Sequence, residues 1–393
     1  MTMSGDQAQN SPGIKISNGL AIISRGSSQV ASFDLEGRLL HYTESGVTYR
    51  RSISNKLIKL AWNGEIRVVE DVPEKEAMGI LDRAYTMASS LKADHLTGEE
   101  ATSLNTISSR SVHWAQSDGR SAEALYSMLP VLPPDQSGSL YIEITSGCRW
   151  NRCTLCRGYE SREYVTKERE QFFAHVDEVL KFYGRGIQSK RSIFLGDVSA
   201  LDIDQKYLLE VLSSLKQKIN LPVYTAFDVF TTPKKKNMIN YRDLGERGLD
   251  RVYVYLESGS YRVIRLFNRH INITETINLI NNIKDHNIPV SIVVMAGIGG
   301  KKFSRDHVDA TANIISQLAL NRGDSILLTP IMESEDSNYG DITKREDLSP
   351  MTLQEKYAQM GEMSETIKVA FREMNGQEIG IPVVKTDLRE AVL

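Results

Sequence analysis

The sequence lacks long apolar runs: no window offers the about 18 uninterrupted apolar residues that a membrane span needs. The polar stretch Met1 to Gly13 also lacks the basic and apolar regions of a secretory leader. We therefore expect a cytoplasmic protein that makes no contact with a membrane. The formal net charge of −3 provides no overall positive electrostatic field that would attract nucleic acid, so we do not expect a nucleic-acid partner.

Cysteine is also scarce, and this scarcity is informative. The only three cysteines of the 393 residues are Cys148, Cys153 and Cys156, with the spacing C-x4-C-x2-C. An odd number of thiols so close together is a poor disulfide framework. Three thiolates from one loop can instead hold three irons of a [4Fe-4S] cluster and leave the fourth iron without a protein ligand. The amino and carboxylate groups of S-adenosylmethionine (SAM) can chelate that iron, so that a reduced cluster can cleave the sulfonium.

The structural alternative for these cysteines is a zinc site or a group of ordinary thiols. A closed zinc site needs a fourth ligand, but there is no fourth cysteine, and the nearest histidine in the sequence is His175. The composition therefore favours iron-sulfur chemistry over zinc. It also leaves no cysteine for an auxiliary cluster.

The first third of the chain indicates a small accessory domain. Residues 1–13 are expected to be disordered, and residues 14–130 to form an N-terminal α+β domain with short antiparallel strands between 15 and 70 and a helix over 73–92. The region lacks the βαβ alternation and the Asp-x-His-x-x-Gly signature of a cobalamin-binding domain. The proline-rich segment 130–134 marks the boundary.

After this boundary, β-rich apolar runs alternate with helical patterns, one of them with Asp202 as its expected N-cap. The expected strands are 140–145, 192–195, 222–227, 251–256, 289–295 and 325–329. Such alternation predicts parallel strands with right-handed crossovers. Six units are fewer than the eight of a complete barrel, so we predict an α/β fold with a partial (β/α)6 TIM-type barrel over 131–335. A C-terminal extension, 336–393, adds a helix and a strand. The cysteines follow the first strand, at the rim where barrels carry their chemistry.

Several segments together resemble the radical SAM superfamily, and within it the coproporphyrinogen-oxidase-like subgroup with C-x4-C-x2-C spacing. The resemblance covers roughly residues 130 to 390 and is carried by segments 132–156, 194–201, 255–259, 296–300 and 383–390. It implies an oxygen-sensitive enzyme with a [4Fe-4S] cluster, SAM, and a one-electron donor such as flavodoxin or ferredoxin.

The resemblance also implies residues that contact SAM. Gly196 and Asp197 end the second barrel strand. Because glycine has no side chain, the backbone at Gly196 can lie close to the methionyl group of SAM, and the carboxylate of Asp197 can accept a hydrogen bond from the SAM ammonium group. Glu257 ends the fourth strand and is placed to reach the ribose or the amino group. Gly297 begins a glycine-rich loop beside adenine, and Tyr159 is placed to flank the adenine ring. Each of these residues also has a purely structural interpretation that stays open. Gly196, Asp197, Glu257 and Gly297 could simply form turns, and Tyr159 could be an aromatic residue of the core.

Three further polar residues, Arg157, Arg162 and Asp228, are expected in loops at the barrel mouth. They could hold a polar substrate, although a solvated surface is the simpler interpretation.

These observations lead to three hypotheses. The first is an enzyme whose 5′-deoxyadenosyl radical abstracts hydrogen from a small-molecule substrate, for example in natural-product biosynthesis. The second places the same chemistry on a tRNA or protein target, with Lys234, Lys235 and Lys236 as a docking surface. The third is a non-enzymatic iron-sulfur redox sensor, which leaves the SAM-contact loops unexplained.

Overall fold

The computed structural model describes residues 13–391 apart from residues 27, 65, 93–95, 97, 128, 156–162, 198, 231–240 and 332–338. The chain forms two compact units. Unit 1 contains Met1–Leu140, Phe173–Arg191 and Glu390–Leu393, and unit 2 contains Tyr141–Phe172 and Ser192–Arg389. The division thus falls after Leu140 rather than at residue 130, and residues 173–191 return to unit 1. The segment 1–12 and the lysine cluster at 234–236 lie outside the described residues.

Unit 1 contains an antiparallel sheet whose seven described strands follow one another in sequence order. The strands are β1 (Gly13–Ser17), β2 (Leu20–Arg25), β3 (Gln29–Asp34), β4 (Leu39–Glu44), β5 (Val47–Arg51), β6 (Leu57–Asn63) and β7 (Ile66–Asp71). Every connection joins neighbouring strands, as in an up-and-down meander. This is the antiparallel sheet that the alternation predicted.

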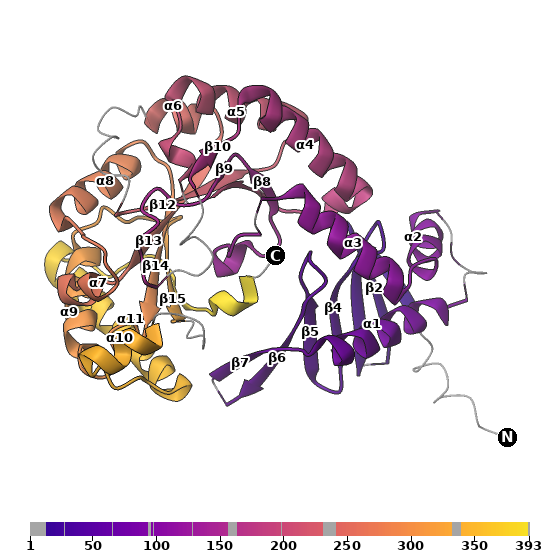
Figure 1. Ribbon diagram of the computed structural model, residues 1–393, viewed down its shortest axis with the longest axis horizontal. Coiled ribbons are helices and arrows are strands. Elements are labelled where there is room, and N and C mark those ends of the chain that lie inside the picture. Colours follow the sequence, from indigo (N-terminus) through magenta and orange to yellow (C-terminus); the bar gives the residue numbers. More distant parts are fainter. Residues whose placement is uncertain are drawn as a thin grey trace. The chain divides into compact units, whose positions relative to one another are not determined.

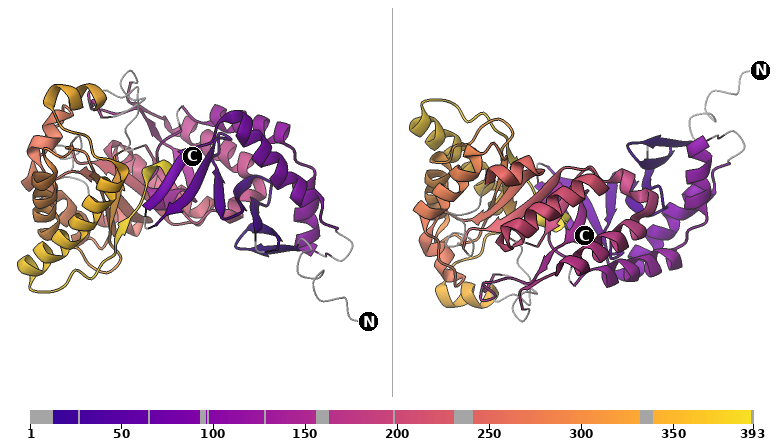
Figure 2. Two further views of the ribbon diagram at one scale, coloured as in Figure 1. Left: turned by 90° about the horizontal axis from the view of Figure 1, so that it is seen from below. Right: turned by 90° about the horizontal axis from the view of Figure 1, so that it is seen from above.

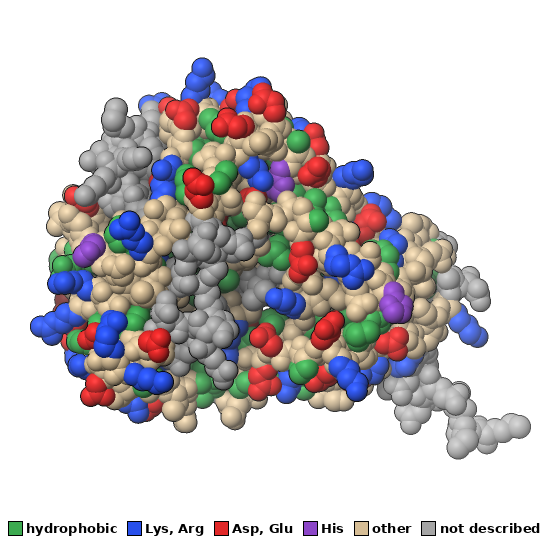
Figure 3. Space-filling model, in the orientation of Figure 1, with side chains coloured by type: hydrophobic (Ala, Val, Ile, Leu, Met, Phe, Trp, Pro, Cys, Tyr) green, Lys and Arg blue, Asp and Glu red, His purple; other side chains and the backbone are tan. Residues whose placement is uncertain are grey.

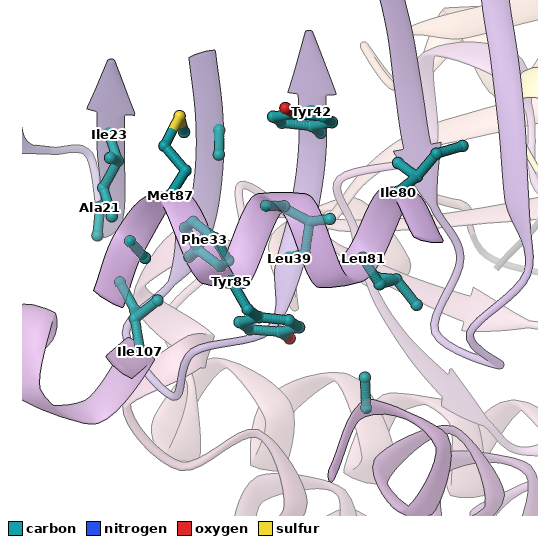
Figure 4. Packing of buried hydrophobic residues seen from close by; sticks show 14 of the residues in the cluster. Ala21, Ile23, Phe33, Leu39, Tyr42, Ile80, Leu81, Tyr85, Met87 and Ile107 are labelled. Carbon is teal, nitrogen blue, oxygen red and sulfur yellow. The ribbon is translucent and has the colours of Figure 1, made fainter. Parts of the chain in front are cut away.

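Helices cover one face of this sheet. They are α1 (Glu74–Ser89), α2 (Gly98–Ser108) and α3 (Val112–Leu125). Alternate residues of the strands, such as Ala21 and Ile23 of β2, point to this face, where α1 presents Leu81 and Tyr85 at helical spacing (Figure 4). Burial of these apolar side chains stabilises the unit by roughly 1.5–3 kcal/mol for each large residue.

Unit 2 is built on a parallel sheet in the order β16-β15-β14-β13-β12-β11-β8 among the described residues. The strands are β8 (Leu140–Glu143), β11 (Ile193–Gly196), β12 (Val223–Asp228), β13 (Leu249–Glu257), β14 (Val290–Ala296), β15 (Ser325–Pro330) and β16 (Val383–Lys385). The six expected barrel strands are confirmed, and β16 adds a further one at the edge. A short hairpin, β9 (Thr145–Ser146) with β10 (Val165–Thr166), follows β8.

The helices of unit 2 lie on the outer side of this curved sheet (Figures 1 and 2). They include α5 (Gln205–Lys218), α6 (Tyr241–Glu246), α7 (Tyr261–Leu266), α8 (Ile273–Asp285), α9 (Ser304–Ser316), α10 (Tyr339–Glu346) and α11 (Leu353–Asn375). Helix α4 (Arg169–Tyr183) begins in unit 2 and ends in unit 1. The partial barrel predicted from the sequence is therefore present. No helix in the described part of the chain is long and apolar enough to cross a membrane.

Short 3-10 helices join several of these elements. They are η1 (Pro134–Gln136), η2 (Gly184–Ser189), η3 (Ala200–Asp202) and η4 (Leu388–Ala391). Asp202 lies at the end of η3 and is not the N-cap of α5 as expected. That cap is Asp204, whose side chain accepts from the Tyr207 backbone N–H at 3.0 Å. Two aspartates close to the helix start made either assignment possible from the sequence.

Candidate functional site

The cysteine loop begins directly after β9, at the carboxyl end of the first strand of the parallel sheet. Cys148 and Cys153 are both buried, with 8% and 4% of their surface exposed. Cys156, together with the predicted Tyr159, Arg157 and Arg162, lies outside the described residues. Two of the three predicted ligands are thus buried in the loop that follows the first strand of the sheet.

Hydrogen bonds tie the cysteine loop to the segment that follows α7. The Trp150 indole N–H donates to the Asn268 carbonyl at 2.8 Å, and the Asn268 side chain donates to the Arg152 carbonyl at 3.0 Å. The Thr154 backbone N–H donates to the Phe267 carbonyl at 3.3 Å. These bonds join the loop after the first barrel strand to the loop after the fourth.

Backbone N–H groups lie close to both thiols, while burial disfavours the anionic form of Cys148. The Leu155 backbone N–H donates to Cys153 Sγ at 3.4 Å. Burial raises the pKa of the Cys148 thiol, while the backbone N–H groups of Asn151 and Trp150 lower it. Backbone donors of this kind are common around metal-bound thiolates, where the metal removes the proton. The described part of the loop therefore fits an iron-sulfur cluster. Among the described residues, no group of three His, Cys, Asp or Glu side chains is arranged to hold a single metal ion.

Three buried carboxylates lie where consecutive strands end. Asp197 follows β11, Asp228 is the last residue of β12, and Glu257 is the last residue of β13; each is 5% exposed. Because parallel strands bring their carboxyl ends to one edge, these side chains and the cysteine loop share the same rim of the sheet. The sequence predicted this placement for Asp197 and Glu257, and placed Asp228 at the barrel mouth.

A buried arginine connects two of these carboxylates. Arg269, which follows α7, pairs with Glu257 through Nη1, and its Nη2 lies 3.9 Å from Asp228 Oδ2. The guanidinium also lies over the Phe230 ring, with its central carbon 4.5 Å from the ring centroid. A guanidinium group can donate two parallel hydrogen bonds to a carboxylate, so Arg269, held by two acids and an aromatic ring, is suited to bind the carboxylate of a ligand.

The electrostatics of Glu257 depend on this arginine and on the cysteines. The pKa of Glu257 is raised to about 7, mainly by burial; Arg269 opposes this shift, and Cys153 and Asp228 add to it. Burial also raises the pKa of Asp228 against the opposing effect of Arg269. Glu257 has a φ of 58°, a left-handed conformation that is uncommon for a side chain of this size. Perturbed carboxylates and strained backbone together are typical of functional sites.

The two predicted glycines are explained in part by packing within the protein. A Cβ on Gly196 would lie 2.7 Å from Cε2 of Tyr141. Gly297 has a φ of 85°, and a Cβ there would lie 2.9 Å from Cγ of Lys356. Its backbone N–H donates to the Gln359 side chain at 2.6 Å. Close packing therefore requires both glycines, and their contacts with SAM stay predictions.

Arg269 was not predicted from the sequence. It stands among many arginines and lysines, and no periodicity distinguishes it. Its position twelve residues after Glu257 becomes informative only when α7 folds back and brings the guanidinium to the carboxylate.

A family model described as the Radical SAM superfamily matches residues 142–315. The match covers somewhat less than half of the chain and identifies a radical SAM domain within that range. The matched range contains all three cysteines and the Asp228–Arg269–Glu257 group, and it confirms the family predicted from the sequence. The matched superfamily is one of enzymes, which supports the prediction of an enzyme activity.

Curated and solved relatives cover parts of the chain. The 4′-phospho-dehydrooxetanocin synthase of Priestia megaterium is 23% identical over 147 residues, which are 34% of this chain and 20% of that protein. Coproporphyrinogen III oxidase (HemN) from Escherichia coli has a TM-score of 0.44 and 14% identity, over 59% of this chain and 52% of that one. Methylornithine synthase (PylB) has a TM-score of 0.41 and 12% identity, over 79% of both chains. The chain thus spans about a fifth of the curated relative and about half of the HemN chain.

Proposed function

We propose that this protein binds a [4Fe-4S] cluster and SAM and removes a hydrogen atom from a small-molecule substrate. When bound at Cys148, Cys153 and Cys156, such a cluster supplies the electron that cleaves SAM to methionine and a 5′-deoxyadenosyl radical. The observation that carries the proposal is the buried group Asp228, Arg269 and Glu257, which lies with the cysteine loop on the rim of the parallel sheet.

The charges of this group complement those of SAM. Two ionised carboxylates and one guanidinium give a net charge of −1, whereas SAM carries a carboxylate, an ammonium and a sulfonium, with a net charge of +1. Arg269 would bind the carboxylate of SAM, and Glu257 its ammonium or a ribose hydroxyl. Because a cation favours the ionised form of an acid, bound SAM would also lower the pKa of Glu257 from about 7.

The remaining predicted contacts belong to the same proposal. Asp197 would accept from the ammonium of SAM, and the backbone at Gly196 would lie beside the methionyl group. Gly297 and Tyr159 would flank the adenine.

The proposed substrate is a small molecule. The Priestia megaterium relative is named as a synthase of a phospho compound, which supports a small metabolite as the substrate. On the face shown in Figure 3, described acidic and basic side chains are interspersed, which is not the arrangement of a basic track for tRNA. An external one-electron donor such as flavodoxin or ferredoxin would reduce the cluster.

The proposal is tested in two steps on the 393-residue chain. After anaerobic reconstitution, we expect about four irons and four sulfides per chain, and a loss of this cluster in each of Cys148→Ser, Cys153→Ser and Cys156→Ser. Candidate substrates deuterated throughout are then supplied with SAM and a reductant, and 5′-deoxyadenosine is analysed by mass spectrometry. Transfer of deuterium identifies the substrate, and repetition with substrates deuterated at single positions identifies the reacting carbon. Full cluster retention in all three variants would overturn the proposal.

A further inference from the structure

The loop that follows β13 connects Glu257, which we assign to SAM, to the start of α7. Its three residues, Ser258, Gly259 and Ser260, are buried. Glu257 has a φ of 58°, in the left-handed region that a residue of this kind rarely adopts. A residue keeps such a conformation only where its surroundings impose it. The groups that bond to this loop therefore decide where the Glu257 carboxylate points.

Helix α9 packs against this loop. The Thr311 hydroxyl accepts a hydrogen bond from the Gly259 backbone N–H at 2.9 Å, and the Asp306 carboxylate accepts from the Ser260 hydroxyl. A Cβ on Gly259 would lie 2.5 Å from the carbonyl oxygen of Ala310, so no side chain fits between the loop and the helix there. The backbone of the loop thus follows the surface of α9.

Ser258, directly after Glu257, is bound by a histidine of the same helix. His307 Nδ1 lies 2.7 Å from Ser258 Oγ, and both side chains are fully buried. Burial lowers the pKa of His307 to about 4, so the imidazole is neutral at pH 7. The Ser258 oxygen also accepts from the Ser260 backbone N–H at 3.1 Å, which leaves its hydroxyl hydrogen for Nδ1. The histidine therefore fixes the direction of the serine hydroxyl and the first turn of the loop.

Helix α9 is also connected to the second loop that is predicted to contact SAM. Its first residue, Ser304, comes soon after the glycine loop 297–300, and the Ser304 hydroxyl accepts from the Gln359 side chain at 2.8 Å. The same side chain accepts from the Gly297 backbone N–H at 2.6 Å. One helix thus ties together the positions of the loops after β13 and β14.

We propose that His307 and Ser258 are positioning residues for SAM. Their hydrogen bond acts through the backbone between Ser258 and Glu257 and holds the Glu257 carboxylate where it can accept from the ammonium or a ribose hydroxyl of SAM. This inference rests on the proposed function, because it concerns the neighbours of a proposed SAM contact. Without the hydrogen bond, the left-handed residue can relax toward the extended conformations that are more stable for it. The carboxylate would then turn away from SAM.

The test measures SAM affinity by equilibrium dialysis on the reconstituted 393-residue protein, without a reductant, so that SAM is bound and not cleaved. Ser258→Ala and His307→Leu should retain the iron content of the wild type and bind SAM about tenfold more weakly, which corresponds to the loss of one hydrogen bond. His307→Asn, whose amide oxygen can replace Nδ1 as the acceptor, should stay within about threefold of the wild type. Circular dichroism establishes that the variants are folded.

The matched control is Ser291→Ala. Ser291 is also fully buried, and its hydroxyl bonds to the Ser325 hydroxyl at 2.8 Å, but it lies near the start of β14, at the opposite end of the sheet. This variant should bind SAM as the wild type does. An equal loss in Ser291→Ala would show that the removal of any buried hydrogen bond has the same effect, and would overturn the inference.

A double-mutant cycle distinguishes positioning from a general effect on structure. In the Glu257→Ala background there is no carboxylate to position, so the further change Ser258→Ala should weaken SAM binding by less than about twofold. The same tenfold loss in both backgrounds would show that Ser258 acts on SAM independently of Glu257, contrary to the inference.

The same measurements separate failure of this inference from failure of the proposed function. A wild-type protein that holds its cluster and does not bind SAM would contradict both. If the wild type binds SAM and Glu257→Ala weakens the binding, but Ser258→Ala and His307→Leu bind as the wild type does, only the inference fails. Wild-type affinity in Glu257→Ala would remove the SAM contact assigned to Glu257, and the positioning roles with it.

Discussion

Arg269 and Glu257 form an ion pair in which both side chains are almost inaccessible to solvent, with 5% and 7% of their surface exposed. The pair joins the end of β13 to the segment after α7, and the same arginine lies 3.9 Å from Asp228. In unit 2 this segment also holds the cysteine loop through Asn268. One buried cation thus organises the acids that we assign to SAM.

The first prediction concerns this pair. Arg269→Met should destabilise the protein by about 3–5 kcal/mol, because it leaves a buried carboxylate without its cation. Glu257→Gln should cost less, since Asp228 still faces the arginine. The double variant should be more stable than the sum of the two losses predicts, by roughly 0.5–3 kcal/mol. Urea unfolding of the four proteins measures this coupling, and strict additivity would show that the two side chains do not interact.

The same variants separate stability from cofactor binding. We expect Arg269→Met to retain the cluster, because the cysteines are intact, and to bind SAM at least tenfold more weakly. Arg265→Met, which removes an arginine four residues earlier, serves as the control. Unchanged SAM affinity in Arg269→Met would contradict the role assigned to its guanidinium.

A second prediction concerns the framework of unit 2. Lys284 of α8 donates to Asp324 at 2.8 Å, and both side chains are buried. Asp324 also accepts from the Val290 backbone N–H at 2.7 Å, at the start of β14. Lys284→Met should therefore destabilise the protein by about 3–5 kcal/mol. The exposed pair of Lys301 with Glu355 gives the comparison: Lys301→Met should change the unfolding free energy by less than about 1 kcal/mol. Similar losses in the two variants would be inconsistent with this account.

A third prediction concerns acid stability. His307 is fully buried, its Nδ1 lies 2.7 Å from Ser258 Oγ, and burial lowers its pKa from 6.5 to about 4. Above pH 6.5 the imidazole is neutral in the folded and the unfolded chain. Between pH 6.5 and 4 only the unfolded chain takes up the proton, so the folded state loses stability as the pH falls.

The measurement compares the wild type with His307→Asn at pH 7 and at pH 4.5. Removal of the imidazole should eliminate roughly 2–3 kcal/mol of the pH-dependent loss, since one pKa unit corresponds to about 1.4 kcal/mol. The other titrating groups are the same in both proteins and cancel in the difference. If the two proteins lose the same stability between these pH values, His307 is not held neutral by burial.

Much of the fold could be predicted because its strands are buried on both faces. The strands β11 to β15 appear in the sequence as short apolar runs between helical patterns, and parallel pairing follows from that alternation. The helix α11 was also predictable, since Thr352 and Glu355 form a capping box before an amphipathic stretch.

The elements that the sequence analysis missed have weaker patterns. The sequence predicts only a short helix over 122–129 here, whereas α3 begins at Val112 and carries a buried Asp118 and Gly119 on the face where apolar residues would mark a helix. Asp118 is there because it pairs with Arg38 and Arg51 of the sheet. Pairings of this kind join residues far apart in the chain, and no local pattern reveals them.

The candidate site likewise contains some residues that could be predicted from the sequence and others that could not. The cysteines were predicted as ligands from their spacing, and Glu257 as a SAM contact from the resemblance of its segment to the radical SAM superfamily. The position of Arg269 depends on how distant segments meet, which periodicity and spacing do not encode.

The most direct test of the central claim is the release of 5′-deoxyadenosine. Reconstituted wild-type protein, incubated without oxygen with SAM and dithionite, should release 5′-deoxyadenosine only when the reductant is present. Cys153→Ala should release none above background, because the cluster has lost a ligand. Absence of the product from the wild type, or equal amounts from wild type and Cys153→Ala, would contradict the account.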